Sequence, residues 1–521
     1  IALALASGVE PACGVYTAIF AGFMVSFLGG SRVQIAGPTA AFATVVAGIV
    51  ATQGMDGLII ATILAGIFLI LMGVFKLGSL IKFIPYTITT GFTAGIAVTI
   101  FIGQIKDFLG LQYASGVKPI ETIEKIEANI EAIGTFSWQA LLVGAVSLAI
   151  LIIYPKFEKK VPPSLIAVIV GALMVKFIPG LDDGVFTIGE LYTIPSGLPS
   201  VDFGSFDISF AKISAVLPNA FTIAILAAIE SLLSCVVADS MVNSRHNSNA
   251  ELVAQGLGNI ASVFFGGIPA TGAIARTMTN INNGGRTPIA GIIHAIVLVL
   301  ILLVLMPYAK FIPMATLAAV LLIVSYNMSE WRTIKRLMKD PKSDVTVLLV
   351  TFFLTVIFDL TIAIEVGLIT ACALFMKRIM ETTEISVIND EINPGDEMGL
   401  SHVHDSLAIP EGCAVYEING PFFFGIANKF DELQANIGQE KPRVRIIRMR
   451  KVPFIDSTGI HNLTNLIRMN QEDGIHIILS GVSPKLHKQL EKARFYNLIA
   501  PDHICPHIDI ALEKAREFLA K

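Results

Sequence analysis

Long runs of apolar residues, separated by short polar breaks, dominate the chain up to about residue 376. A helix needs about 20 mostly apolar residues to cross the hydrocarbon core of a bilayer. The pattern predicts such helices near residues 12–29, 56–76, 83–104, 137–155, 162–178, 217–237, 251–266, 287–307, 312–326, 343–359 and 361–376. Residues 1–8 have the character of the end of another helix, so we expect the first helix to be truncated at the N-terminus. This part is predicted to be a polytopic helical membrane protein.

The remaining residues follow a different pattern. Residues 377–521 hold 37 of the 78 charged side chains of the chain. Period-two apolar runs at 413–418, 444–449 and 475–479 predict strands, with helical runs between them. Alternation of this kind is typical of an α/β domain. We therefore expect a transmembrane domain over residues 1–380, a linker over 381–401 and an α/β domain over 402–521.

Basic residues indicate the orientation of the predicted helices. Cytoplasmic loops of membrane proteins carry an excess of lysine and arginine. Residues 156–160, residues 332–342 and the pair Lys377 and Arg378 show this excess, whereas 179–216 has five acidic residues and one lysine. The C-terminal domain is thus predicted to be cytoplasmic and the protein to lie in the plasma (inner) membrane.

Composition supports this interpretation and excludes other classes of protein. Only 15% of the residues are charged and the mean hydropathy is +0.71, against roughly 25% charged residues in soluble domains. The net charge of −4 argues against a nucleic-acid partner. The five cysteines form no CxxC pair, so neither a disulfide framework nor a zinc site is predicted. We expect no cofactor and no enzymatic activity.

Two short apolar pieces, 37–52 and 272–283, begin at breaks rich in glycine and proline. Each break leads into a helix of small residues, and Pro38 suits a first helical turn because its missing N–H would be unpaired there. A helix N-terminus offers free N–H groups and a partial positive charge to an anion. Two such segments in corresponding halves indicate an inverted-repeat transporter with its site near the bilayer midplane. The alternative is that small residues only permit close helix packing.

Two charged residues lie within apolar segments of the predicted membrane domain, one in the run 221–237 and one in the short piece 272–283. Glu230 interrupts the apolar run 221–237, and a carboxylate inside a membrane helix is a functional candidate. Ser234 follows at i+4 on the same helix face. Arg276 follows the start of the second short helix and would supply positive charge near an anion, unless it pairs with a carboxylate such as Glu230.

Four segments resemble blocks of the SulP (sulfate permease) anion transporters. They are residues 29–42, 228–234, 255–259 and 266–277. The resemblance implies 14 helical segments in a 7+7 inverted repeat, forming a core and a gate domain that move as an elevator. It also implies a homodimer in the lipid membrane.

The resemblance further implies which residues bind the substrate. The anion would lie between Thr39, Ala40 and Ala41 on one side and Ala273, Ile274, Ala275 and Arg276 on the other. Glu230 and Ser234 would couple transport to H⁺ or Na⁺. Expected substrates are sulfate, bicarbonate or C4-dicarboxylates. An anion exchanger and an uncoupled chloride-type channel remain alternatives.

The C-terminal domain resembles the STAS domain. The segment Asp456-Ser457-Thr458-Gly459 follows a predicted strand and opens a predicted helix. In STAS proteins of the anti-sigma antagonist type, the serine at the position of Ser457 is phosphorylated. The alternative is that Asp456 and Ser457 only cap the helix. A STAS domain implies a regulatory role and a possible protein partner.

Overall fold

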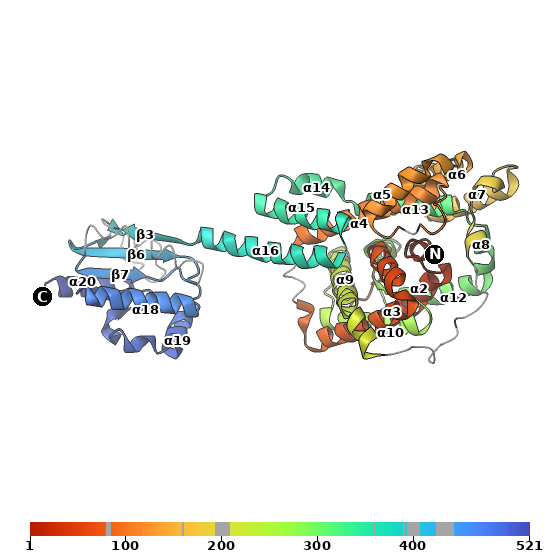
Figure 1. The fold of residues 1–521 in the computed structure, drawn as a ribbon. Helices are drawn as coiled ribbons and strands as arrows, with labels where there is room; N and C mark the ends of the chain where they lie inside the picture. Colours follow the sequence, from red (N-terminus) through yellow and green to blue (C-terminus); the bar gives the residue numbers. More distant parts are fainter. Residues whose placement is uncertain are drawn as a thin grey trace. The chain divides into compact units, whose positions relative to one another are not determined.

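The computed structural model describes the chain except for residues 80–84, 118, 159–160, 193–198, 200–208, 359, 389–390, 393–406, 424–441 and 521. It divides into two compact units, Ile1–Ala371 and Cys372–Lys521. The elements of both units are labelled in Figure 1. Each unit is considered by itself.

The first unit is built from long apolar helices. Within the described residues, six helical stretches have the length and composition needed to cross a membrane. They include α2 (Pro11–Leu28), α3 (Ala40–Val74), α4 (Tyr86–Leu109), α6 (Trp138–Ile153), α9 (Phe210–Val242) and α13 (Met314–Met328). Other helices of this unit are α1 (Ala2–Ala6), α5 (Thr122–Glu131), α7 (Pro163–Phe177), α8 (Ile188–Leu191), α10 (Ser248–Phe264), α11 (Ile274–Asn282), α12 (Ile289–Val304), α14 (Trp331–Leu337) and α15 (Lys342–Ile357). Helix α16 (Leu360–Thr382) begins in this unit and ends in the second.

Helix α3 contains the break that the sequence predicts between residues 52 and 56. Gly54 interrupts its helical geometry with a φ of 71°, a left-handed value that glycine adopts without steric cost. The segment before Gly54 is the first of the two short helices expected from the sequence. A second, longer helix follows Gly54 and ends at Val74, so α3 consists of two helices joined at a kink.

The helices of the first unit pack in two groups. In one group, α3 packs against α9 and α10, and α2 packs against α10 and α12. In the other group, α4 packs against α13 and α15, and α6 packs against α7 and α13. The short helix α1 contacts α2 and α3 of the first group and α13 of the second. Fully buried Phe42 and Phe92 belong to the core that α3 and α4 share.

The second unit contains a five-stranded sheet in the order β3-β6-β7-β8-β9. Strands β6 (Cys413–Asn419), β7 (Val444–Arg448), β8 (His476–Ser480) and β9 (Ile504–Cys505) are parallel. The first strand, β3 (Glu384–Ile388), runs antiparallel to β6. A separate two-stranded sheet joins β4 (Glu391–Ile392) to β5 (Leu407–Ala408).

Helices cover both faces of this sheet, because alternate strand residues point to opposite sides. Ile418, Ile447 and Leu479 pack with residues of α18 (Ser457–Glu472) and α19 (Pro484–Lys492). Val415, Ile446 and Ile478 pack with α20 (Ile508–Leu519). Strand β3 falls within residues 381–401, the stretch expected to be a linker, and the structure places it on the edge of the sheet.

Candidate anion-binding site at two helix starts

The two short helices begin beside each other. Strand β1 (Ala36–Gly37) leads into α3 and strand β2 (Thr271–Gly272) leads into α11. The two strands pair antiparallel, with Ala36 opposite Gly272. The backbone N–H of Ala273 extends this pairing by donating to the carbonyl of Ile35 at 2.9 Å. Segments about 235 residues apart in the sequence are thus joined by their backbones.

Neither helix start is capped by a side chain. Thr39 and Ala273 are the N-cap residues of α3 and α11, and neither accepts a hydrogen bond from the first turn through its side chain. The first N–H groups of a helix have no partner within the helix. Ala40, Ala41 and Ala273 are buried, whereas Ile274 and Ala275 are exposed. The small residues therefore leave the backbone at both starts within reach of a small ligand.

Glu230 is attached to the start of α3. The Thr39 hydroxyl donates to Glu230 Oε2 at 2.9 Å instead of capping its own helix. The extended segments that contain β1 and β2 are called the leads into α3 and α11. Ser234, one turn further along α9, contacts the lead into α3, because its hydroxyl donates to Gln34 Oε1 at 2.8 Å. The structure thus brings Thr39 and Glu230 together and gives Ser234 a different partner.

Arg276 extends from α11 to the other helix start. Its guanidinium donates to the carbonyl of Pro38 and lies against Gly37. The pair between Arg276 and Glu230, considered from the sequence, is absent from the ion pairs of the described residues. Arg276 therefore places positive charge at the junction of the two leads.

Side chains from neighbouring helices satisfy the backbone of both extended leads. Unpaired backbone groups are costly inside a membrane. The Thr277 hydroxyl accepts from Ile35 N–H at 3.0 Å, and Asn259 bonds both the N–H and the carbonyl of Ala270 at 2.8 and 2.9 Å. Thr17 does the same for Ile268, accepting from its N–H at 2.7 Å and donating to its carbonyl at 3.2 Å.

Two further polar residues were missed by the sequence reasoning. Gln34 donates to the carbonyl of Ser231 at 3.1 Å, and the Ser231 hydroxyl accepts from Gly272 N–H at 3.0 Å. A Cβ on Gly272 would collide with the Gln34 side chain, so the close approach of β2 to Gln34 requires glycine at this position. For Ser231 the available signal was a polar residue in a mostly apolar helix, whereas Gln34 lies outside the helices and offered no such signal.

Glu251 is another buried carboxylate that the sequence reasoning did not select. It lies in the first turn of α10 and is fully buried. Its carboxylate accepts from the N–H groups of Gly30 and Ser31 at 2.9 and 3.2 Å, and from the Gln255 amide at 3.0 Å. It holds the loop that enters β1. Its acidic character in an apolar helix was a signal equal to that of Glu230.

Cavities of about 370, 330, 130 and 400 Å³ lie elsewhere in the first unit. None of these four is lined by the two helix starts. The site is accordingly defined by backbone groups and by Thr39, Glu230 and Arg276.

Ser457 is exposed at the first position of α18 in the second unit. The preceding Asp456 caps this helix, since its carboxylate accepts from Gly459 N–H at 2.7 Å. The capping role considered for Asp456 is therefore present, and the Ser457 side chain is accessible.

Comparisons with known proteins identify both units. Residues 1–351 match the model of the sulfate permease family, and residues 406–511 match that of the STAS domain. The putative sulfate transporter YvdB of Bacillus subtilis is 39% identical over 515 residues, covering 98% of this chain and 93% of that protein. The bicarbonate transporter BicA of Picosynechococcus is 29% identical over 533 residues, covering 99% and 91%.

Solved structures show the same fold. The murine solute carrier 26 member A9, an anion transporter in the inward-facing state, superposes with a TM-score of 0.87 at 18% identity, covering 99% of this chain and 88% of that one. The transmembrane domain of a cyanobacterial BicA has a TM-score of 0.61 at 29% identity, covering 71% and 92%. The predicted fold class is confirmed, as are the membrane location and the cytoplasmic STAS domain. The chain belongs to the sulfate permease family of anion transporters.

Proposed function

We propose that this protein is a secondary active transporter of a small oxyanion or carboxylate, coupled to H⁺ or Na⁺. The substrate is sulfate, bicarbonate or a C4-dicarboxylate. Relatives named as sulfate and bicarbonate transporters support the first two. Backbone N–H groups at helix starts recognise negative charge without distinguishing strongly among such anions.

The observation that carries the proposal is the pair of uncapped helix starts joined by β1 and β2. An anion between them receives N–H groups from Ala40 and Ala41 on one side and from Ile274 and Ala275 on the other. Thr39 and Ala273 stand at the two N-cap positions. Arg276 adds a full positive charge at the Pro38 carbonyl. Both helix dipoles point their positive ends at the same place.

Coupling arises through Glu230 and its contact with Thr39. A carboxylate within a membrane helix is costly when charged and unpaired. Loading of H⁺ or Na⁺ at Glu230 removes that cost, and the Thr39 hydrogen bond ties this event to the start of α3. Ser234 supports the same region by holding Gln34. Anion and cation binding are then linked, each strengthening the other.

The helix packing supports an elevator-type movement of the site. The two helix starts and Glu230 belong to the group that contains α3, α9 and α10. An elevator-type shift of this group against the group of α4, α13 and α15 would carry the anion across the membrane. A homodimer, lipid contacts and a protein partner of the STAS domain stay predictions.

The test is uptake by purified protein in liposomes. Labelled sulfate, bicarbonate, fumarate and chloride are offered in turn, with and without Na⁺ and pH gradients. We expect one oxyanion or carboxylate to accumulate against its gradient when one cation gradient is imposed. Uptake that requires only an internal anion indicates an exchanger, and a large conductance without accumulation indicates a channel.

A variant pair tests the location of the site in the same assay. Ala40→Leu and Ala273→Leu fill the space beside the helix starts and should abolish uptake. Ala149→Leu makes the same change on the exposed face of α6 and should leave uptake intact. Wild-type uptake by both helix-start variants would overturn the assignment.

A further inference from the structure

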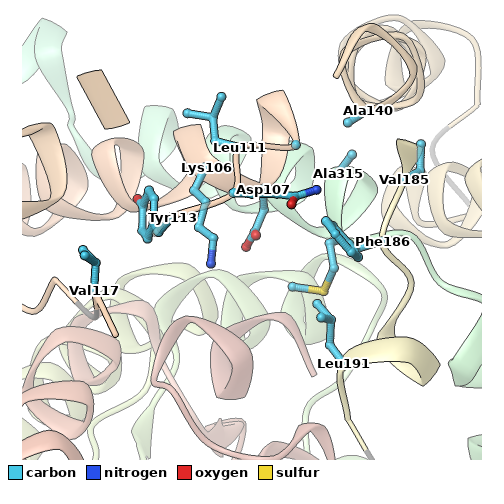
Figure 2. Close-up of a pocket in the computed structure, with 13 residues that line it drawn as sticks. Lys106, Asp107, Leu111, Tyr113, Val117, Ala140, Val185, Phe186, Leu191 and Ala315 are labelled. Carbon is cyan, nitrogen blue, oxygen red and sulfur yellow. The ribbon is translucent and has the colours of Figure 1, made fainter. Parts of the chain in front are cut away.

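Two neighbouring cavities adjoin the C-terminal end of α4, and neither is lined by residues of the two helix starts. Figure 2 shows the larger one. The larger measures about 370 Å³ and lies among the end of α4, residues 110–117, residues 185–191 and the start of α13. The smaller measures about 130 Å³ and is bounded by α1, α4, α5 and α13. Asp107 and Met314 line both cavities. They are therefore neighbouring parts of one region.

Charged groups of both signs face this region. Figure 2 shows the side chains of Lys106 and Asp107 directed into the larger cavity, and Lys125 of α5 lines the smaller one. Within the described part of the chain, none of the three makes a hydrogen bond or ion pair through its side chain. Lys106 Nζ lies 4.8 Å from the centroid of the Tyr113 ring. All three residues are half-buried.

Charged groups in such positions are normally paired, because partial burial removes solvent that stabilises the charge. Burial lowers the pKa of Lys125, because partial desolvation disfavours its charged form. Two cations and one anion thus lie around one region, and among the described residues no hydrogen bond or ion pair satisfies their side chains. A ligand that supplies the opposite charges would satisfy all three.

Most of the other residues around the larger cavity are apolar, although Gln112 and Tyr113 also line it. Leu111 and Val185 are buried beside it, and Phe186, Leu191 and Met314 belong to the same wall. Ligand sites commonly combine an apolar wall with a few polar groups that fix orientation. The volume suits a molecule with a short apolar side chain.

We propose that this region binds a zwitterion, an apolar α-amino acid, with its carboxylate toward Lys106 and Lys125 and its ammonium toward Asp107. The apolar side chain lies against Leu111, Phe186 and Leu191. A simple organic anion would leave Asp107 without a hydrogen-bond donor, and a simple amine would face two lysines. The site is separate from the helix starts and stands whatever anion is transported.

Three probes of one shape test the charge requirement. L-leucine carries both charges, N-acetyl-L-leucine only the carboxylate, and L-leucinamide only the amine. Titration calorimetry on the full purified chain, without added transport anion, should give an affinity for leucine about tenfold or more above either analogue. Equal binding of N-acetyl-leucine or of leucinamide overturns the zwitterion assignment, and absence of leucine binding at millimolar concentration overturns the site.

Variants then locate the binding. Asp107→Asn and Lys106→Gln should each weaken leucine binding about tenfold. Lys176→Gln is the matched control, because Lys176 Nζ lies 5.2 Å from the Phe311 ring centroid and lines a different cavity. Leu191→Trp narrows the larger cavity without changing any charged group. Because Leu191 is 49% exposed, we expect the variant protein to fold. Leucine binding that survives in a folded Leu191→Trp or Asp107→Asn protein contradicts the proposal.

Discussion

Arg276 is the residue at which charge and structure are most closely combined. Its guanidinium bonds the Pro38 carbonyl at the lead into α3. Arg276→Gln removes the charge and shortens the reach, so we expect anion affinity to fall by about 1.5–3 kcal/mol, the range for a charged hydrogen bond. Sulfate should lose more than a monovalent anion. Binding titrations with both anions measure the difference.

Arg286 provides the control for this substitution. It lies just beyond the other end of α11 and donates to the carbonyls of Ile281 and Gly285 at 2.7 and 2.8 Å. Arg286→Gln should leave anion affinity unchanged. If Arg276→Gln lowers only the thermal stability, Arg276 is a structural tie between the two leads.

Glu230 is expected to determine coupling. Glu230→Gln imitates the permanently protonated carboxyl group and keeps an oxygen that accepts from Thr39. Downhill anion exchange should persist, whereas accumulation driven by the pH or Na⁺ gradient should be lost. Uptake against a concentration gradient, driven by each ion in turn, measures this.

Glu365→Gln is the matched control, because Glu365 is an exposed carboxylate on the apolar helix α16. It should retain accumulation. Undiminished accumulation by Glu230→Gln would place the coupling elsewhere or make the protein an exchanger.

The residues that complete the site differ in how far the sequence alone could predict their roles. Glu230 and Arg276 stand out because a charge in an apolar segment is unusual. Gln34, Asn259 and Thr277 do not, because their function depends on which backbone crosses them in the fold. Asn259 contacts Ala270, 11 residues away, but Thr277 contacts Ile35, which is 242 residues away. Sequence patterns at helical spacing carry no information about such a crossing.

Among the elements, the extended leads depend most on tertiary contacts. Asn259 pairs with both backbone groups of Ala270. Asn259→Ala leaves a buried N–H and a buried carbonyl without this partner, and each such loss costs about 1–3 kcal/mol. We expect a lower unfolding temperature in detergent and a weaker response of that temperature to added anion.

Asn283→Ala tests whether any asparagine loss has this effect. Asn283 is exposed just after α11, where its amide donates to the Thr279 carbonyl at 2.8 Å. This variant should unfold near the wild-type temperature. An Asn259→Ala protein with unchanged stability would show that the other contacts of the lead into α11, such as those of Thr17 with Ile268 and of Ser231 with Gly272, hold it without Asn259.

The elements themselves were predictable to different degrees. Apolar runs predict the positions of most long helices, and the gap between the predicted segments 37–52 and 56–76 coincides with the interruption of α3 at Gly54. Strand β3 was not expected, because Glu384–Ile388 is short and lies in a polar stretch. It is ordered by pairing with β6, a contact that local propensity does not encode.

For the whole molecule, the family and the fold class could be predicted from the sequence, because the four motif segments are distributed over both halves of the membrane unit. The substrate could not be predicted, since N–H groups at a helix start respond to charge more than to anion shape. The role of the STAS domain can be tested directly, because the proposed anion site lies wholly in the first unit.

A chain that ends at Glu381 retains every residue of the proposed anion site and most of α16. It loses β3 and the remaining sheet, so Ile379 and Met380 no longer have the core of the second unit to pack against. We expect this chain to transport anion when it inserts correctly, with a lower rate or poorer expression, because it keeps the proposed anion site and loses only residues of the second unit. Initial uptake rates per folded molecule, with folding checked by thermal unfolding, give the comparison with the full chain.

Ser457→Asp in the full chain separates regulation from loss of the domain. Ser457 is exposed at the start of α18, and a negative charge there is compatible with the helix dipole, so the domain should stay folded. Its effect on uptake should be smaller than that of Ala40→Leu, and Ser457→Ala should match the wild type. Complete loss of transport by a well-folded chain ending at Glu381 would mean that the STAS domain is part of the moving machinery, because every group that contacts the anion would still be present.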